Sequence, residues 1–320
     1  MKGLKVFSAF DGISCGQLAF QRAEIPVEKY FASEICDYSI KIAKKNFPDT
    51  IEVGDVRDVN SEDYKDIDIL IGGSPCQSFS FAGTMSGMTT KEKQDVTTLE
   101  QYLELKEKGF EFEGYSYLFW EYVRLLKELK PKYFLLENVK MSEKWKKVIT
   151  DALGVEPILI DSGLLTAQHR ERLYWTNIPN VEVPKDKNVV ITDILENITV
   201  DGNIEKFKPS VRKNVVEQYE KIIHSERDIQ RLECSSGWQD NKVGIYKTPT
   251  LRHGNSFCLV KDKDNKIRRI TVTEAERLQT LPDGYTESVS DSNRFAAIGN
   301  GWTVDVIAHI FSYLRSEICL

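Results

Sequence analysis

Short apolar strand patterns alternate with helical patterns along the first 180 residues of this 320-residue chain. Runs rich in β-branched and aromatic residues recur between stretches with apolar residues at helical spacing. Such alternation is typical of a sheet of parallel strands with crossover helices. The sequence therefore predicts a doubly wound α/β domain. The expected strands are residues 4–10, 30–34, 51–56, 67–71, 133–137, 158–161 and 173–176, and the expected helices are residues 16–24, 38–47 and 116–129.

The strand and helix rhythm is lost after Pro179. Polar, glycine-containing stretches follow, and a change of composition of this kind marks a second domain. Residues 303–314 are again apolar at helical spacing, which predicts a helix that packs back on the first domain. The expected boundaries are 1–180 for the first domain, 181–270 for a smaller second domain, and 271–320 for a return segment that completes the first.

The composition is ordinary for a soluble globular protein, with 41% hydrophobic and 29% charged residues. Charged side chains interrupt the first twenty residues and no run reaches transmembrane length, so we expect a cytoplasmic protein. The six cysteines form no CxxC pair and no zinc-like spacing with the four histidines, so we expect reduced thiols and no metal. The net charge is −6, but residues 181–270 hold 17 Lys and Arg against 14 Asp and Glu, which is compatible with a local nucleic-acid contact.

A cysteine lies in a turn directly after one of the predicted buried strands. The apolar run 67–71 is followed by the Gly- and Pro-shaped turn 72–80, which carries Cys76. The carboxyl edge of an open α/β sheet is where ligands bind. Most free cysteines pack as small hydrophobes, but a thiol in a polar turn can ionise and attack. Glu137 closes the strand 133–137 at the same edge, where it can either donate a proton to a substrate or cap a helix.

Acidic residues close two of the first three predicted strands, and a glycine-containing turn follows the remaining one. The turn Phe10–Gly16 leads from the first strand into a helix, the second strand ends at Glu34, and the third leads to Gly54 and Asp55. In nucleotide-type sites such a turn brings backbone close to the ligand, and a carboxylate after the second strand binds ribose hydroxyls. Each acid alone also fits a solvated strand end, but their recurrence favours an adenosyl-type pocket.

Gln168, Arg170 and Arg172 alternate along an extended segment, so we expect them to share one face. Two arginines on one face suit a planar, oxygen-bearing substrate or a phosphate. An ion-pair ladder with Glu171 on the surface is the alternative.

Residues 84–114 give no strand signal, although connections in such folds usually have only a few residues. Thr97 and Glu100 form a capping-box pattern ahead of apolar residues at helical spacing, and Gly109 is a stop signal. We expect a mobile loop that carries its own short helix. A surface decoration is the alternative.

Together these motifs resemble the C5-cytosine DNA methyltransferases of bacteria and phages. The first turn, with Ile13–Gly16, and the last turn, Asn300–Thr303, depart from the commoner bacterial pattern and are similar to those of mammalian de novo methyltransferases. The resemblance covers nearly the whole chain except the region after Pro179. The matching pieces, in family order, are Phe10–Gly12, Glu34, Gly54–Asp55, Ser74–Gln77 with Phe79–Ser80, Glu137–Val139, Gln168 with Arg170 and Arg172, Glu276–Gln279 with Pro282–Asp283, and Gly299–Asn300.

The resemblance implies a Rossmann-like S-adenosylmethionine-dependent methyltransferase domain and a smaller target-recognition domain. It implies that Cys76 attacks C6 of a flipped-out cytosine, that Glu137 holds N3 and the exocyclic amine, and that Arg170 and Arg172 steady the pyrimidine oxygen and the thiol region, with Arg172 at O2. The methyl group then passes to C5 and leaves S-adenosylhomocysteine. The implied cofactor contacts are Phe10, Asp11, Gly12, Ile13, Ser14, Glu34, Ile35, Asp55, Val56, Ser74, Pro75, Leu118, Asn300, Gly301 and Trp302.

The implied partner is double-stranded DNA that carries a short motif. The implied DNA contacts are Gln77, Ser80, Thr250, Leu251 and Arg252. We expect a bacterial or phage-encoded enzyme that acts as a monomer on nucleoid DNA. A cognate restriction endonuclease is left open as a partner.

The alternative is a tRNA cytosine-5 methyltransferase on the same scaffold. The loop 77–83 looks like that of DNA-directed members, and the second domain is sizeable, so DNA is favoured. A non-catalytic DNA-binding descendant is expected to lack Cys76, Glu137 or Arg172, and all three are present. A thiol peroxidase or hydrolase needs a histidine paired with Cys76, and no histidine lies in a matching position.

Overall fold

A computed structural model of the protein describes residues 3–76, 78–79, 87–197, 232–233, 247–251, 258–261 and 267–318. The chain forms two compact units. Unit 1 comprises Met1–Ile160, Glu171–Val183 and Val306–Leu320, and unit 2 comprises Asp161–Arg170 and Pro184–Asp305. The return segment expected at 271–320 is thus divided between the two units.

Unit 1 is built on a seven-stranded sheet with the order β3-β2-β1-β4-β5-β8-β6. Its strands are β1 (Leu4–Ala9), β2 (Val27–Ser33), β3 (Ile51–Glu52), β4 (Ile69–Gly73), β5 (Tyr133–Val139), β6 (Ile158–Asp161) and β8 (Glu171–Thr176). The chain order reverses between β1 and β4, which is the switch point where doubly wound sheets bind ligands. The predicted α/β class is confirmed.

One strand departs from the expected parallel sheet. β1 runs parallel to β2 and β4, and β4 runs parallel to β5, whereas β8 runs antiparallel to β5. The expectation of parallel strands throughout is therefore wrong at β8. An apolar run such as Leu173–Thr176 shows that a strand is buried and does not encode its direction.

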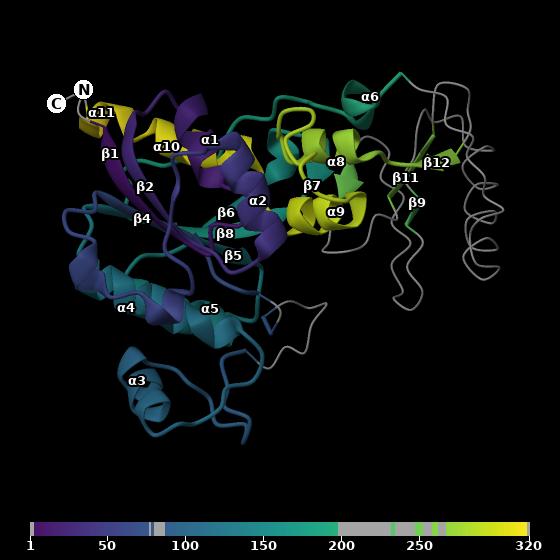
Figure 1. Ribbon diagram of the computed structural model, residues 1–320. Helices are drawn as coiled ribbons and strands as arrows, with labels where there is room; N and C mark the ends of the chain where they lie inside the picture. The colour runs from purple at the N-terminus through teal and green to yellow at the C-terminus, as the bar shows by residue number, and fades with distance from the viewer. Residues whose placement is uncertain are drawn as a thin grey trace. The chain divides into compact units, whose positions relative to one another are not determined.

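Helices cover both faces of this sheet (Figure 1). One face carries α1 (Cys15–Arg22), α2 (Asp37–Asn46), α10 (Val304–Ser312) and α11 (Arg315–Ile318), and the other carries α4 (Phe119–Leu129) and α5 (Glu143–Leu153). Short 3-10 helices are η1 (Val56–Asp58), η2 (Ser61–Asp63) and η3 (Ser116–Leu118). The helices expected at 16–24, 38–47, 116–129 and 303–314 are confirmed with small shifts of their ends.

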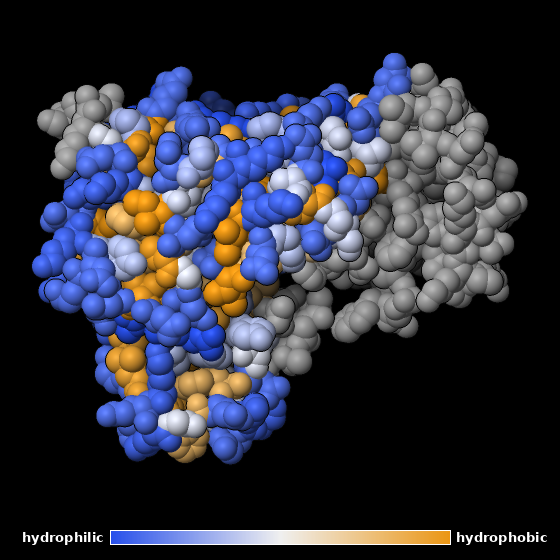
Figure 2. Space-filling model, viewed as in Figure 1, coloured by the Kyte–Doolittle hydropathy of each residue, from blue (hydrophilic) through white to orange (hydrophobic). Residues whose placement is uncertain are grey.

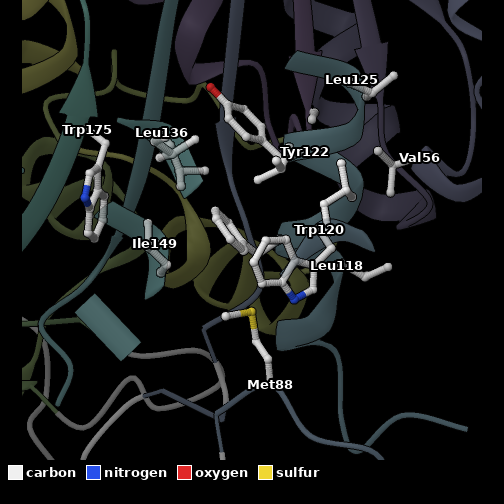
Figure 3. Packing of buried hydrophobic residues seen from close by; sticks show 14 of the residues in the cluster. Val56, Met88, Leu118, Trp120, Tyr122, Leu125, Leu136, Ile149 and Trp175 are labelled. Atoms are coloured by element: carbon white, nitrogen blue, oxygen red, sulfur yellow. The ribbon is translucent and has the colours of Figure 1, made fainter. Parts of the chain in front are cut away.

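Aromatic and branched side chains fill the space between the sheet and the helices α4 and α5. Figure 3 shows Leu136 of β5 and Trp175 of β8 on the side of Ile149 of α5, with Tyr122 of α4 facing them. The Tyr122 hydroxyl donates to the carbonyl oxygen of Leu70 at 3.3 Å, so even its polar end is satisfied in this core.

The insertion, which we define as residues 87–114, packs as an additional layer outside α4 and α5 (Figure 1). It contains the expected short helix, α3 (Leu99–Glu107), but the N-cap is Thr98, one residue later than predicted. The hydroxyl of Thr98 accepts from the Gln101 N–H at 3.1 Å. The described part of the segment is thus a packed layer. Its buried apolar residues are Met88, Val96, Leu99, Tyr102 and Leu105.

The outer side of the insertion keeps some apolar surface. Figure 2 shows hydrophobic atoms among hydrophilic ones over the part that Figure 1 labels α3. Leu103 and Phe110 are each 39% exposed there.

Unit 2 combines short strands with helices. Its elements are η4 (Ser162–Leu164), β7 (Gln168–His169), α6 (Ile191–Ile194), β9 (Leu232–Glu233), β10 (Thr248–Pro249), β11 (Cys258–Lys261), β12 (Ile267–Arg269), α8 (Val272–Leu278) and α9 (Asp291–Asn300). The strands form a β12-β11-β9 sheet and a β10-β7 pair. Among the residues that the structure describes, no helix has the length and apolar character needed to cross a membrane.

Candidate active site

Cys76 lies three residues beyond the end of β4, at the edge where the sheet order reverses. Gly73, the last residue of β4, is paired with Glu137 on β5, so the thiol turn starts beside the strand that carries this carboxylate. The Ser78 N–H donates to the Ser116 hydroxyl at 3.1 Å, which fixes the turn beyond the cysteine. The thiol turn and the carboxylate thus lie at the same edge of the sheet, as the sequence predicted, and the structure places them on adjacent strands.

Glu137 and Arg172 form a close ion pair. The Arg172 Nε lies 2.9 Å from the Glu137 Oε1, and the two side chains are only 13% and 11% exposed. The antiparallel pairing of β5 with β8 sets Arg172 opposite Val139, two residues from the carboxylate. A second guanidinium nitrogen, Nη1, donates to the carbonyl oxygen of Glu171 at 2.8 Å. The strand pairing therefore delivers a carboxylate and a guanidinium together to the edge of the sheet.

Asn138 ties this strand end to the thiol turn. Its side-chain amide donates to the carbonyl oxygen of Ser74 at 3.2 Å and to the Ser74 hydroxyl at 3.0 Å, and the residue is 1% exposed. Asn138 belongs to the motif Glu137–Val139, but the sequence alone assigns it no role. The available signal was a polar residue in the middle of a buried strand end, where an amide must find partners.

Arg170 occupies a different setting from Arg172. It belongs to unit 2, is 4% exposed, and donates to three carbonyl oxygens, those of Leu251 at 3.1 Å, Gly299 at 3.2 Å and Gly301 at 3.1 Å. Gln168 shares a partner with Arg170, because its Oε1 accepts from the Leu251 N–H at 2.6 Å. The expectation that Arg172 lies on the same face stays a prediction.

Gln279 holds the turn 300–302 within unit 2. Its amide donates to the carbonyl oxygens of Ile298 at 2.9 Å and Gly301 at 3.2 Å, and its Oε1 accepts from the Thr303 hydroxyl at 2.6 Å. Gln279 is fully buried. The sequence reading missed this role although it quoted the motif that contains the residue.

The turn after β1 has an unusual backbone. Phe10, Gly12 and Ser14 have φ angles of 59°, 62° and 57°. A Cβ placed on Gly12 would meet no atom within 4 Å, so the space beside this glycine is open. The Gly12 N–H donates to Glu34 Oε2 at 2.8 Å, which ties the turn to the end of β2. Ile13 and Ser14 are buried beneath the turn.

Glu34 and Ile35 form the neighbouring strand end. Glu34 Oε1 accepts from the N–H groups of Ile35 at 2.8 Å and Cys36 at 2.9 Å. Ile35 is 64% exposed. The exposed, branched side chain of Ile35 can pack against an apolar ring, and the fixed carboxylate of Glu34 can accept hydrogen bonds. A nucleoside has both matching parts, a flat base and ribose hydroxyls.

Asp11 forms a buried polar centre in the same turn. The Tyr30 hydroxyl donates to Asp11 Oδ1 at 2.7 Å, and the Ser14 hydroxyl donates to Asp11 Oδ2 at 2.5 Å. Burial raises the pKa of the Asp11 carboxyl, and the two hydroxyls act against this rise.

Asp55 lies three residues beyond the end of β3, which is shorter than the predicted strand 51–56, and it caps η1. Its Oδ1 accepts from the Arg57 N–H at 2.9 Å, and the Arg57 guanidinium forks the carboxylate with Nε–Oδ1 at 3.0 Å and Nη2–Oδ2 at 2.5 Å. These bonds to Arg57 lower the pKa of the Asp55 carboxyl. Val56 and Leu118, two further expected cofactor contacts, are buried at 4% and 8% exposure.

Two of the five expected DNA contacts, Thr250 and Leu251, lie among the described residues. The Thr250 hydroxyl donates to the carbonyl oxygen of His169 at 2.9 Å, and the Leu251 N–H donates to Gln168 Oε1 at 2.6 Å. Leu251 is buried in unit 2. Gln77, Ser80 and Arg252 lie outside the described residues.

A comparison with protein-family models decides the identity of the chain. The model of the C-5 cytosine-specific DNA methylases matches residues 4–153 and 158–316. The chain belongs to this family. This methylase is a DNA (cytosine-5) methyltransferase, as the ordered motifs predicted.

Its curated relatives are Type II methyltransferases. The methylase is 30% identical to the Type II methyltransferase M1.ScrFI of Lactococcus lactis over 95% of this chain and 76% of the relative. It is 26% identical to the Type II methyltransferase M.HhaI of Haemophilus parahaemolyticus over 99% and 96% of the two chains. These relatives do not favour the tRNA alternative.

Solved structures support the fold of the methylase. The S. pombe Dnmt2 methyltransferase matches with a TM-score of 0.63 at 18% identity, over 99% of this chain and 100% of that chain. At this identity the likeness concerns the fold alone.

Proposed function

We propose that this methylase moves the methyl group of S-adenosylmethionine to C5 of a flipped-out cytosine in a short double-stranded DNA motif, through a covalent adduct with Cys76. One observation carries the proposal. Asn138 fastens the Cys76 turn to the strand end where Glu137 and Arg172 lie 2.9 Å apart. A nucleophile, a carboxylate and a guanidinium thus converge on one edge of the sheet.

The chemistry of cytosine explains why these three groups are needed. C5 is a poor nucleophile until a group adds at C6, and a thiolate can add there and leave again. The Cys76 sulfur forms a bond to C6, and the ring electrons move toward N3, where Glu137 holds the proton. Loss of the C5 proton after methylation then expels the thiolate. None of these atoms is accessible in a stacked duplex, so the base must be flipped out.

Arg172 is proposed to bind O2 of the base. Its Nε is held by Glu137, and its guanidinium plane can place a further donor against a planar, oxygen-bearing ring. Arg170 was expected to share this work. Its three carbonyl partners in unit 2 support a role in holding the loop that contains Gly299 and Gly301, and its part in binding the base stays a prediction.

The first turns of unit 1 fit S-adenosylmethionine. The space beside Gly12 is open, Glu34 is fixed at the second strand end for ribose hydroxyls, and Ile35 offers an exposed apolar surface for adenine. Asp55 is fixed at the third strand end for the adenine amino group. When bound, the cofactor supplies an electrophilic methyl group on a sulfonium. The remaining proposed contacts are Phe10, Asp11, Ile13, Ser14, Val56, Ser74, Pro75, Leu118, Asn300, Gly301 and Trp302.

Reading of the DNA motif is proposed to fall to residues 181–270, with Thr250, Leu251 and Arg252, while Gln77 and Ser80 contact the DNA beside the base. Arginine can read base edges bidentately in the major groove.

We further propose a cytoplasmic enzyme that acts as a monomer on DNA. A restriction endonuclease that cleaves the same motif is the partner proposed from the curated relatives.

The test is expression in a host without C5-methylcytosine, followed by conversion sequencing of host DNA. The wild-type chain is expected to methylate one short motif, and the Cys76→Ala variant is expected to leave the DNA unmodified. Host tRNA from the same cells is sequenced in parallel. Methylated tRNA with unmodified DNA would refute the proposal.

A further inference from the structure

The insertion is joined to α4 by a shared apolar core. Figure 3 shows Met88 pointing towards Trp120 of α4, with Leu118 beside them. Met88 and Trp120 are 0% and 1% exposed. The Trp120 indole N–H also donates to the carbonyl oxygen of Val96 at 3.3 Å. The insertion is therefore packed against α4, the helix that carries the buried carboxylate of Glu121.

Glu121 on α4 is fully buried and gathers donors from two directions. From α3, the Tyr102 hydroxyl donates to Oε1 at 2.5 Å, and the Lys106 ammonium donates to the same oxygen at 2.6 Å. From α4 itself, the Arg124 Nε donates to Oε2 at 2.7 Å. A buried carboxylate is costly unless such partners surround it, so the insertion supplies two of the donors that keep Glu121 in place.

Arg124 carries this link to the proposed cofactor segment. Its Nη2 donates to the carbonyl oxygen of Val56 at 3.1 Å. Figure 3 shows Val56 beside Leu125 of α4. The backbone of Val56 is thus held by an arginine whose own position depends on Glu121.

A second link runs through aromatic rings to Asp55. The ring of Tyr117, in η3, stacks on Phe112 of the insertion with centroids 4.5 Å apart and an interplanar angle of 22°. The Tyr117 hydroxyl lies close enough to the Arg57 guanidinium for that charge to act against burial, which raises the pKa of Tyr117. The Arg57 guanidinium in turn donates two hydrogen bonds to the Asp55 carboxylate. The direction of this carboxylate therefore depends on a chain of contacts that starts in the insertion.

We propose that Tyr102, Lys106 and Tyr117 are positioning residues for the adenosyl part of the cofactor. The insertion acts through Glu121 and Arg124 on the backbone of Val56, and through Arg57 on the carboxylate of Asp55. This inference rests on the proposed function, because it takes Asp55 and Val56 as cofactor contacts. It assigns to the insertion a role in cofactor affinity and not in closure over DNA.

The test compares Lys106→Met, Tyr102→Phe and Tyr117→Phe with a matched control, Glu100→Gln. Glu100 forms an ion pair with Lys127 between the same two helices at 3.2 Å, but both side chains are exposed, at 76% and 56%. The binding of S-adenosylhomocysteine is measured by titration calorimetry on the full chain. The Michaelis constants for S-adenosylmethionine and for DNA and the value of kcat are measured with a DNA substrate.

The three positioning variants are expected to weaken S-adenosylhomocysteine binding by roughly 2- to 30-fold, the range typical of coupling through packed networks. The Michaelis constant for S-adenosylmethionine should rise in parallel, while kcat at saturating cofactor and the Michaelis constant for DNA stay near the wild-type values. Lys106→Arg should restore the affinity, and Glu100→Gln should leave it unchanged. Wild-type affinity in all three variants, or a loss of kcat or DNA affinity in its place, would overturn the inference.

Tyr102→Phe and Tyr117→Phe each remove a single hydroxyl, so at least one folded variant is expected even if Lys106→Met unfolds. An Asp55→Asn variant separates the two levels of the argument. If it weakens cofactor binding while the insertion variants do not, the inference alone is overturned. If neither it nor Glu34→Gln changes the binding, the proposed cofactor site fails, and the inference fails with it.

Discussion

The guanidinium Nε of Arg172 lies 2.9 Å from Oε1 of Glu137 on the neighbouring antiparallel strand. Because both side chains are almost buried, the pair holds the carboxylate in one direction at the edge where Cys76 follows β4. The antiparallel direction of β8 thus brings a strand end that carries an arginine to the edge of the sheet where Cys76 follows β4.

Glu137→Gln should lower kcat by about 10²-fold or more, because an amide cannot hold and deliver a proton at N3. Cofactor affinity should be retained. The matched control is Glu171→Gln, which removes an exposed carboxylate paired with Lys140 at 3.3 Å. Steady-state methylation kinetics of both variants check the prediction, and equal rates for Glu137→Gln and the control would contradict the assignment.

Asn138→Ala should lower both stability and rate. The substitution leaves the buried carbonyl and hydroxyl of Ser74 without their amide partner, and an unsatisfied buried group costs about 1–3 kcal/mol of unfolding free energy. The thiol turn also loses its tie to β5, so kcat should fall while S-adenosylhomocysteine still binds. Denaturant unfolding and single-turnover methylation measure the two effects. A destabilised variant with full activity would show that the tie does not position Cys76.

Glu34→Gln should weaken S-adenosylhomocysteine binding by roughly 10-fold, the effect of losing a charge-assisted hydrogen bond to a ligand. The variant keeps one acceptor oxygen, which can serve either the Gly12 N–H or the N–H groups of Ile35 and Cys36, so part of this backbone anchoring should be retained. Titration calorimetry gives the affinity, and kcat at saturating cofactor should be nearly unchanged. If the Michaelis constant for DNA changes instead, Glu34 has another role.

Arg57 should set the pH dependence of cofactor binding. The guanidinium lowers the pKa of Asp55 below its ordinary value of 3.8, so the carboxylate is charged above that pH and its contribution is lost only as the pH falls further. Arg57→Met removes the largest lowering cause, the guanidinium, so burial, which raises the pKa of Asp55, is opposed only by the backbone N–H of residue 57 and the charge of Lys106. The affinity of the variant for S-adenosylhomocysteine should therefore begin to fall at a higher pH than in the wild type. Calorimetric titrations from pH 8 downward check this, with Asp58→Asn as the control, and superimposable wild-type and Arg57→Met profiles would contradict it.

The strands were predictable because a strand that is buried on both faces of a sheet consists of a nearly continuous run of apolar residues. That rule predicts that Cys76 and Glu137 lie at the same edge of the sheet. It gives no information on strand direction, so the antiparallel β8 is not predictable from it.

Buried polar contacts between distant segments were not predictable from spacing. Glu121 lies on a helix whose apolar pattern was recognised, but nothing in that pattern shows that Tyr102 and Lys106 reach its carboxylate. Gln279 likewise belongs to a sequence motif, but the motif does not show that its amide donates to the carbonyl oxygens of Ile298 and Gly301. Such networks depend on tertiary placement rather than on local periodicity.

Covalent trapping tests the central claim most directly. DNA that carries the methylation motif with fluorine at C5 of the target cytosine is incubated with the methylase and S-adenosylmethionine, and the products are analysed by mass spectrometry. Because fluorine cannot leave as a proton does, the bond between the sulfur and C6 should persist, and a peptide that contains Cys76 should carry the methylated base. The Cys76→Ala variant should give no adduct. An adduct at another residue, or none with a wild-type enzyme that methylates ordinary DNA, would contradict the account.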